Sequence, residues 1–110
     1  MKSMNRVQLI GWLGKDISVK IAKNGSLYGY FRMATDRFHK DAKGGTVKKT
    51  SWHTVWVWDP KKAAACQFYL TKGSHVLVEG ILNYRDYTGR DGIVKHLSEI
   101  KATTLVDLDR

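Results

Sequence analysis

Alternating hydrophobic and polar positions dominate the chain, and a period of two residues indicates β-strands. The pattern predicts five strands, the first of which Gly11 and Gly14 interrupt as a bulge or bend would. Asn24-Gly25 predicts a tight hairpin, because both residues tolerate a positive φ. The predicted strand segments cover residues 6–13 with their continuation 17–21, 27–38, 51–58, 76–87 and 93–106.

One helix is predicted between the third and fourth strands. Asp59 is placed to accept hydrogen bonds from free backbone amides, and Pro60 suits the first helical turn. The helix is predicted over Lys61–Leu70, and Gly73 is predicted to stop it. The stretch 39–50 breaks the alternation and is predicted as a long, flexible, basic loop.

This order of elements predicts an all-β fold of the OB type, a five-stranded Greek-key barrel with one helix between strands 3 and 4. Closing the sheet removes most exposed edges, which suits a chain so rich in strands. The sequence contains no linker and no internal repeat, so residues 1–110 are predicted to form a single domain.

The segment 51–58 carries the clearest functional pattern. Side chains alternate between the two faces of a strand, so Trp52, Trp56 and Trp58 share one face while Val55 and Val57 point into the barrel. Three tryptophans on an outer face mark an interaction surface. Bases of a single strand stack on such rings for about 1–3 kcal/mol each, with little regard to their identity.

The charge of the chain points to a polyanionic partner. Lys and Arg number 19 against 10 Asp and Glu, a net charge of +9. Residues 32–50 hold six basic and two acidic side chains beside the tryptophan strand, which suits phosphate pairing. The candidates for phosphate contact on this basis are Arg32, Arg37, Lys48 and Lys49.

Other classes of function find less support in the sequence. No apolar stretch approaches the roughly 20 residues of a membrane span, and no basic amphipathic helix is present. The four histidines are scattered and Cys66 is the only cysteine, so no catalytic residues, metal site or cofactor are predicted. A single thiol and the absence of a signal peptide favour a reduced, cytoplasmic setting.

The chain resembles the bacterial single-stranded-DNA-binding protein family over nearly its whole length. The matching motifs are Gly11-Trp12-Leu13-Gly14, Asn24-Gly25, Ala34-Thr35, Trp52-His53, and Tyr69-Leu70-Thr71-Lys72-Gly73-Ser74 with Val76, Val78, Glu79 and Gly80. The resemblance implies binding of single-stranded DNA in replication, repair or recombination, with no enzymatic activity.

The resemblance also assigns roles to individual residues. Trp52 falls on a base-stacking position of the family, Trp58 where Phe is usual, and Tyr87 where Trp is usual. Phe38 or His39 falls on a further stacking position at the loop entrance, and Arg85 on a basic position. Together with Trp56 from the strand pattern, the stacking candidates are therefore Trp52, Trp58, Tyr87, Trp56, Phe38 and His39.

The resemblance further implies a homo-oligomer, with a tetramer favoured over a dimer. His53 takes a subunit-contact position in the family, although an inward orientation is an equal alternative, and Trp12 is a second candidate for a subunit contact. The acidic tail with which family members recruit other proteins has no counterpart here, so no such recruitment is expected. The alternatives are a dimer of the primosomal replication protein N type, a protein-interaction OB module, and single-stranded RNA binding.

Overall fold

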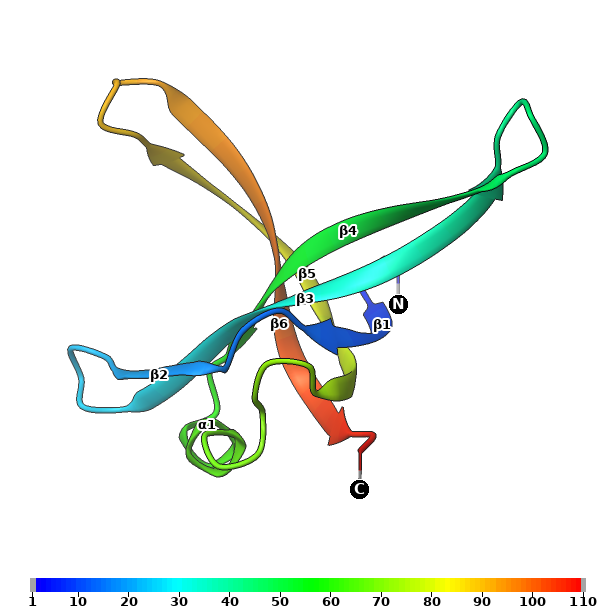
Figure 1. Ribbon diagram of the computed structural model, residues 1–110. Helices are drawn as coiled ribbons and strands as arrows, with labels where there is room; N and C mark the ends of the chain where they lie inside the picture. The colour runs from blue at the N-terminus through cyan, green and yellow to red at the C-terminus, as the bar shows by residue number, and fades with distance from the viewer. Residues whose placement is uncertain (1, 110) are drawn as a thin grey trace.

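The strands form one sheet that curls around a core in the computed structural model, which describes residues 2–109 (Figure 1). They follow the order β1-β5-β6-β4-β3-β2, and pairing between β1 and β3 closes the barrel. The elements are β1 (Val7–Leu13), β2 (Ser18–Ile21), β3 (Leu27–Lys40), β4 (Thr46–Val57), α1 (Pro60–Cys66), β5 (His75–Thr88) and β6 (Val94–Asp107).

β1 and β2 act as two halves of one barrel strand. Both pair antiparallel with β3, and the four residues 14–17 between them lie opposite only Phe31 and Arg32. The interruption expected at Gly14 is therefore a bulge, whereas the one expected at Gly11 is wrong, because Gly11 pairs with Val76 within an unbroken β1. Counted this way the barrel has five strands with a helix between the third and fourth, which confirms the predicted OB-fold.

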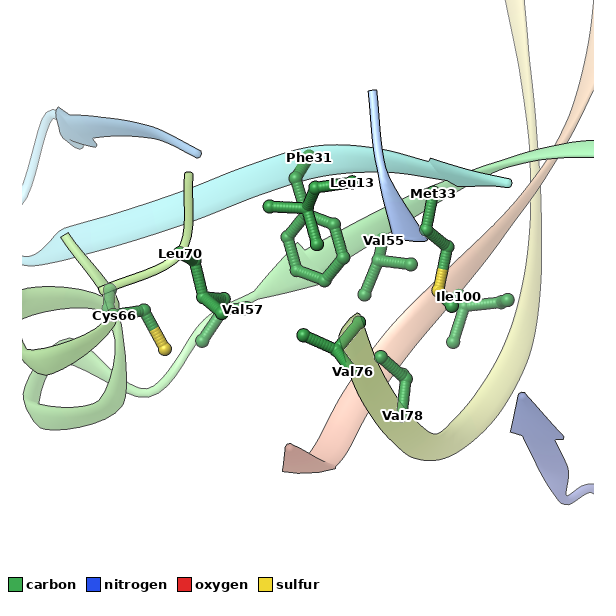
Figure 2. Packing of buried hydrophobic residues seen from close by; sticks show 11 residues of the cluster. Leu13, Phe31, Met33, Val55, Val57, Cys66, Leu70, Val76, Val78 and Ile100 are labelled. Carbon is green, nitrogen blue, oxygen red and sulfur yellow. The ribbon is translucent and has the colours of Figure 1, made fainter. Parts of the chain in front are cut away.

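The core is built from the inward positions of the strands. Figure 2 shows Phe31, Met33 and Val55 meeting Val76 and Val78 inside the barrel. Cys66 and Leu70, from α1 and the turn after it, close one end of this core beside Val57. The alternation read from the sequence thus identifies the buried side of β3 and β4 correctly.

The helix begins where expected but is shorter than predicted. The Asp59 carboxylate accepts hydrogen bonds from the backbone amides of Lys61 and Lys62, and Pro60 takes the first turn. The helix ends at Cys66, four residues before Leu70. The amides of Phe68 and Tyr69 already bond three residues back, so the chain tightens into turns that carry Leu70 into the core.

The prediction of a long flexible loop over 39–50 is wrong. β3 runs on to Lys40 and β4 begins at Thr46, so only five residues form the turn. The Asp41 carboxylate accepts from the amides of Lys43 and Gly45, and Gly44 supplies the positive φ that the turn needs. The segments 36–40 and 46–51 are mostly polar on both faces, so the sequence shows no hydrophobic alternation there, although the two strands pair with each other throughout.

Two long hairpins extend beyond the core as arms. The β3–β4 arm and the β5–β6 arm project from the barrel in different directions (Figure 1). No residue in 34–52 is buried, and none in 81–98. Each arm is therefore a twisted ribbon with solvent on both faces, joined to the barrel at its base.

Candidate nucleic-acid interface

Four aromatic rings form a packed group on the outer face of β3 and β4. Cross-strand pairing places Tyr30 opposite Trp56, and the Tyr30 and Trp56 ring centroids lie 5.0 Å apart. Trp56 and Trp58 stack nearly parallel, with centroids 5.3 Å apart and an angle of 7° between their planes. Tyr28 lies 5.1 Å from Trp58. Trp58 remains 47% exposed, so one ring of this group offers a broad surface to a ligand.

Trp52 lies on the same face, nearer the β3–β4 arm. Its ring is 50% exposed, and the Arg32 guanidinium lies over it at 5.4 Å from the centroid. Trp52 and Arg32 also line a pocket with Gly14, Lys15 and other residues of the bulge between β1 and β2. An aromatic surface and two cations therefore lie side by side, the combination that suits a stacked base and its phosphate.

Glu99 links the aromatic group to β5. Its side chain is only 7% exposed. It accepts a 2.7 Å hydrogen bond from Trp56 Nε1 and bonds of 2.5 and 3.3 Å from Nε and Nη2 of Arg85. Burial raises the pKa of Glu99, but the hydrogen bonds from Arg85 and Trp56 outweigh it and hold the pKa below the usual range. Arg85, predicted for phosphate contact, is thus already paired.

The outer face continues across β6 to the β5–β6 arm. Lys101 pairs with Trp56 in the parallel ladder between β4 and β6, and it lines a hollow with Trp56, Trp58 and Arg85. Tyr87 lies further out on the arm, where the Lys95 ammonium is 6.0 Å from its ring centroid. Aromatic and cationic side chains are therefore distributed over both arms and the barrel between them.

The predicted candidates on the β3–β4 arm fall on two different faces. Phe38 pairs with Lys48, and the register puts both on the face that carries Trp52. His39, Arg37 and Lys49 alternate with them and point to the opposite face. The sequence predicted six stacking and five phosphate candidates. Eight of these share the outer face in the structure: Trp52, Trp56, Trp58, Tyr87, Phe38, Arg32, Lys48 and Arg85.

Sequence reasoning missed two tyrosines and two lysines of this face. Alternation along β3 puts Tyr28 and Tyr30 on one face of that strand, but it does not connect them to the tryptophans of the neighbouring strand. The antiparallel pairing of β3 with β4 makes that connection. Lys95 and Lys101 depend on pairings of β6 with strands distant in sequence, so no local pattern signals them.

His53 and Trp12 lie away from the aromatic group. His53 points inward, where its Nε2 lies 2.8 Å from Thr35 Oγ1 and burial lowers its pKa. Of the two orientations that the sequence left open for His53, the structure therefore shows the inward one. Trp12 lies on the outside of β1 and stacks on His75, with centroids 4.7 Å apart.

The described part of the chain shows neither a cluster of metal ligands nor a helix that could cross a membrane. No three His, Cys, Asp or Glu side chains gather as metal ligands within residues 2–109. Burial raises the pKa of the Cys66 thiol, which keeps it protonated and a poor nucleophile. Over the same residues, no helix combines the length and apolar character that a membrane crossing requires.

Comparison with known proteins agrees with this geometry. Single-stranded DNA-binding proteins from Xanthomonas campestris pv. campestris and Neisseria meningitidis serogroup B are 38% and 37% identical over 104 and 103 residues, 94% of this chain in each case. The chain spans about 60% of the length of these relatives. A mitochondrial single-stranded DNA-binding protein from Danio rerio is 30% identical over 113 residues, covering 97% of this chain and 77% of that protein.

A solved structure and a family model extend the agreement to the whole fold. A Plasmodium falciparum SSB in complex with ssDNA superposes with a TM-score of 0.88 at 33% identity, covering 99% of this chain and 98% of the other. Residues 4–108 match the model of the single-strand binding protein family. The chain therefore belongs to the single-strand binding protein family.

Proposed function

We propose that this protein binds single-stranded DNA with little sequence preference and protects it during replication, repair or recombination. The observation that carries the proposal is the outer face on which Trp52 and Trp58 stand half-exposed among cations. Members of this family are binding proteins and not enzymes. The role needs no catalytic residue, metal or cofactor.

The proposed path of the strand follows the outer face from one arm to the other. Bases stack on Trp52 and Trp58 near the barrel, on Phe38 along the β3–β4 arm, and on Tyr87 along the β5–β6 arm. Every base has a π-face, so stacking on these rings selects single strands without selecting sequence. The arms project from the barrel, so they enlarge the surface around which a strand can pass (Figure 1).

Phosphates pair with the cations beside these rings. Arg32 and Lys48 share the face of Trp52, and Lys95 and Lys101 continue it on β6. Arg37, Lys49 and His39 face the other side of the arm, where they serve a strand only if it passes around the arm. The affinity is expected to fall steeply with salt, because each paired phosphate releases condensed counterions.

The proposal includes a homo-oligomer, with a tetramer favoured. The outside of the sheet at β1 and the end of β6 carries four exposed apolar side chains: Ile10, Trp12, Val106 and Leu108. A patch of this kind on the outside of the barrel suits a self-complementary contact between copies. Sedimentation equilibrium measures the subunit number, and Ile10→Glu is expected to lower it.

A cytoplasmic location belongs to the same proposal. The relative from Danio rerio is named as mitochondrial, so an organelle that contains DNA is the competing location. A fluorescent fusion in the native host distinguishes the two.

The deciding experiment is a titration of intrinsic tryptophan fluorescence with oligo(dT) at low and high salt. Stacked bases are expected to quench the emission, and the affinity is expected to drop as salt rises. A parallel titration with oligo(U) measures discrimination through the 2′-hydroxyl. Absence of quenching by either polymer at low salt would overturn the function and reassign the aromatic face to a protein partner.

A further inference from the structure

Glu99 is the one buried acidic side chain among the described residues, and it lines a hollow of the outer face with Trp56, Trp58, Arg85 and Lys101. A buried carboxylate is costly unless it is paired and fully hydrogen-bonded. Glu99 meets that condition through two partners on two other strands, Trp56 on β4 and Arg85 on β5. Both partners were independent candidates for contact with DNA.

The contact with Trp56 fixes a ring that has little free surface. Trp56 stacks on Trp58 at 5.3 Å and lies between it and Tyr30. Its indole N–H donates a hydrogen bond to Glu99 Oε2. Trp56 is thus held on one edge by a hydrogen bond and packed against neighbouring rings, so it supports Trp58 and offers less free surface to a base than Trp58 does.

The contact with Glu99 also compensates the positive charge of Arg85 on the same surface. Nε and Nη2 of the guanidinium point at the two oxygens of Glu99 in a side-on, bidentate arrangement. Arg85 itself is 48% exposed, so a phosphate can approach its remaining N–H groups. A phosphate there also meets the Glu99 carboxylate, whose negative charge opposes its binding.

We propose that Glu99 is a positioning residue for single-strand binding, which fixes Trp56 beneath Trp58 and withholds the charge of Arg85 from phosphate. The proposal rests on the proposed function. Its consequence is that binding in this part of the face depends on stacking more than on charge, while phosphate pairing is left to Arg32, Lys48 and Lys101.

Three variants test this inference in the 110-residue chain by oligo(dT) titration over a salt series. In Glu99→Gln the amide oxygen still accepts from Trp56, but Arg85 becomes an uncompensated cation. The slope of log K against log salt is then expected to steepen by about 0.7, the value for one further neutralised phosphate on a single strand. Maximal quenching is expected to stay at the wild-type level, because Trp58 keeps its support.

The double variant Glu99→Gln with Arg85→Gln is expected to restore the wild-type slope. Glu79→Gln is the matched control. It also raises the net charge by one, but Glu79 pairs with Arg6 rather than with Arg85. The inference predicts a smaller change of slope for Glu79→Gln than for Glu99→Gln.

An unchanged slope in a folded Glu99→Gln protein would overturn the inference, as would an equal change in Glu79→Gln. Both results leave DNA binding by the wild-type chain intact, so they are distinguishable from failure of the proposed function, in which the wild-type chain itself gives no quenching. Far-UV circular dichroism of each variant verifies that it is folded.

Discussion

Trp52 lies so close over Gly14 that a Cβ on the glycine would come within 2.5 Å of Trp52 Cζ3. Gly14 belongs to the bulge between β1 and β2, and Trp52 to β4, so the bulge defines where the ring can rest. The glycine has an ordinary negative φ, so an alanine is tolerated by the backbone and is resisted only by the ring.

Gly14→Ala is therefore expected to displace Trp52 without unfolding the barrel. Affinity for oligo(dT) should fall while thermal stability stays within a few degrees of the wild type. Gly11→Ala is the contrasting variant, since its Cβ would meet the backbone oxygen of Ala34 at 2.1 Å, a contact that no side-chain motion relieves. A loss of stability in both variants, measured by thermal denaturation, would contradict this account of Gly14.

Removal of the Trp52 ring tests its stacking role directly. Trp52→Ala is expected to cost about 1–3 kcal/mol of binding free energy, the usual value for one stacked base. Phe68→Ala is the control, because Phe68 is 83% exposed on the turn after α1 and is outside the proposed path. Equal affinities for the two variants would remove Trp52 from the binding surface.

The two neighbouring lysines of β4 are expected to behave differently. Lys48 shares the face of Phe38 and Trp52, whereas Lys49 pairs with Arg37 on the other face. Lys48→Ala should reduce the salt slope by about 0.7, as expected for one lost phosphate contact on a single strand. If Lys49→Ala lowers the slope as much, the strand passes around the arm rather than along one face.

Stability is expected to depend on pH through His53. Its pKa in the folded protein lies below the ordinary 6.5, because burial disfavours the charged ring. Between that lowered pKa and 6.5 the unfolded chain binds more protons than the folded one, so stability falls as pH drops through this window and recovers as pH rises. His53→Gln removes the titrating ring and should flatten this part of the profile.

Urea denaturation at pH 7.5 and pH 5 measures this effect. The wild type should lose more stability on acidification than His53→Gln does, while the exposed-residue variant His39→Gln should behave as the wild type. An identical loss in the wild type and His53→Gln would assign the acid sensitivity to other groups.

The barrel was predictable from the sequence because its strands alternate strictly wherever one side is buried. One such case is the alternation of Val55 and Val57 with Trp56 and Trp58, and the burial of the two valines confirms it. The β3–β4 arm was not predictable in this way. Arg37 to Lys49 lies in solvent on both faces, so only the cross-strand pairing specifies a strand there.

Part of the candidate site was also predictable from the sequence. Trp52 and Trp58 follow from alternation within one strand, and Tyr87 from the family resemblance. The pairing of Arg85 with Glu99 was not foreseen, because it joins β5 to β6 over 14 residues and also recruits Trp56 from β4. Such a contact is a property of the tertiary structure that no local pattern carries.

The arms lack buried residues, and this gives the molecule an uneven distribution of local stability. Amides in the arms need only a local opening to exchange with solvent, whereas those of β1 and the start of β5 lie over the core and exchange through far larger openings. The arms also carry Phe38, Lys48 and Tyr87. Part of the proposed binding surface therefore resides on backbone that is less protected than the core strands, and a bound strand would slow hydrogen exchange most in the arms.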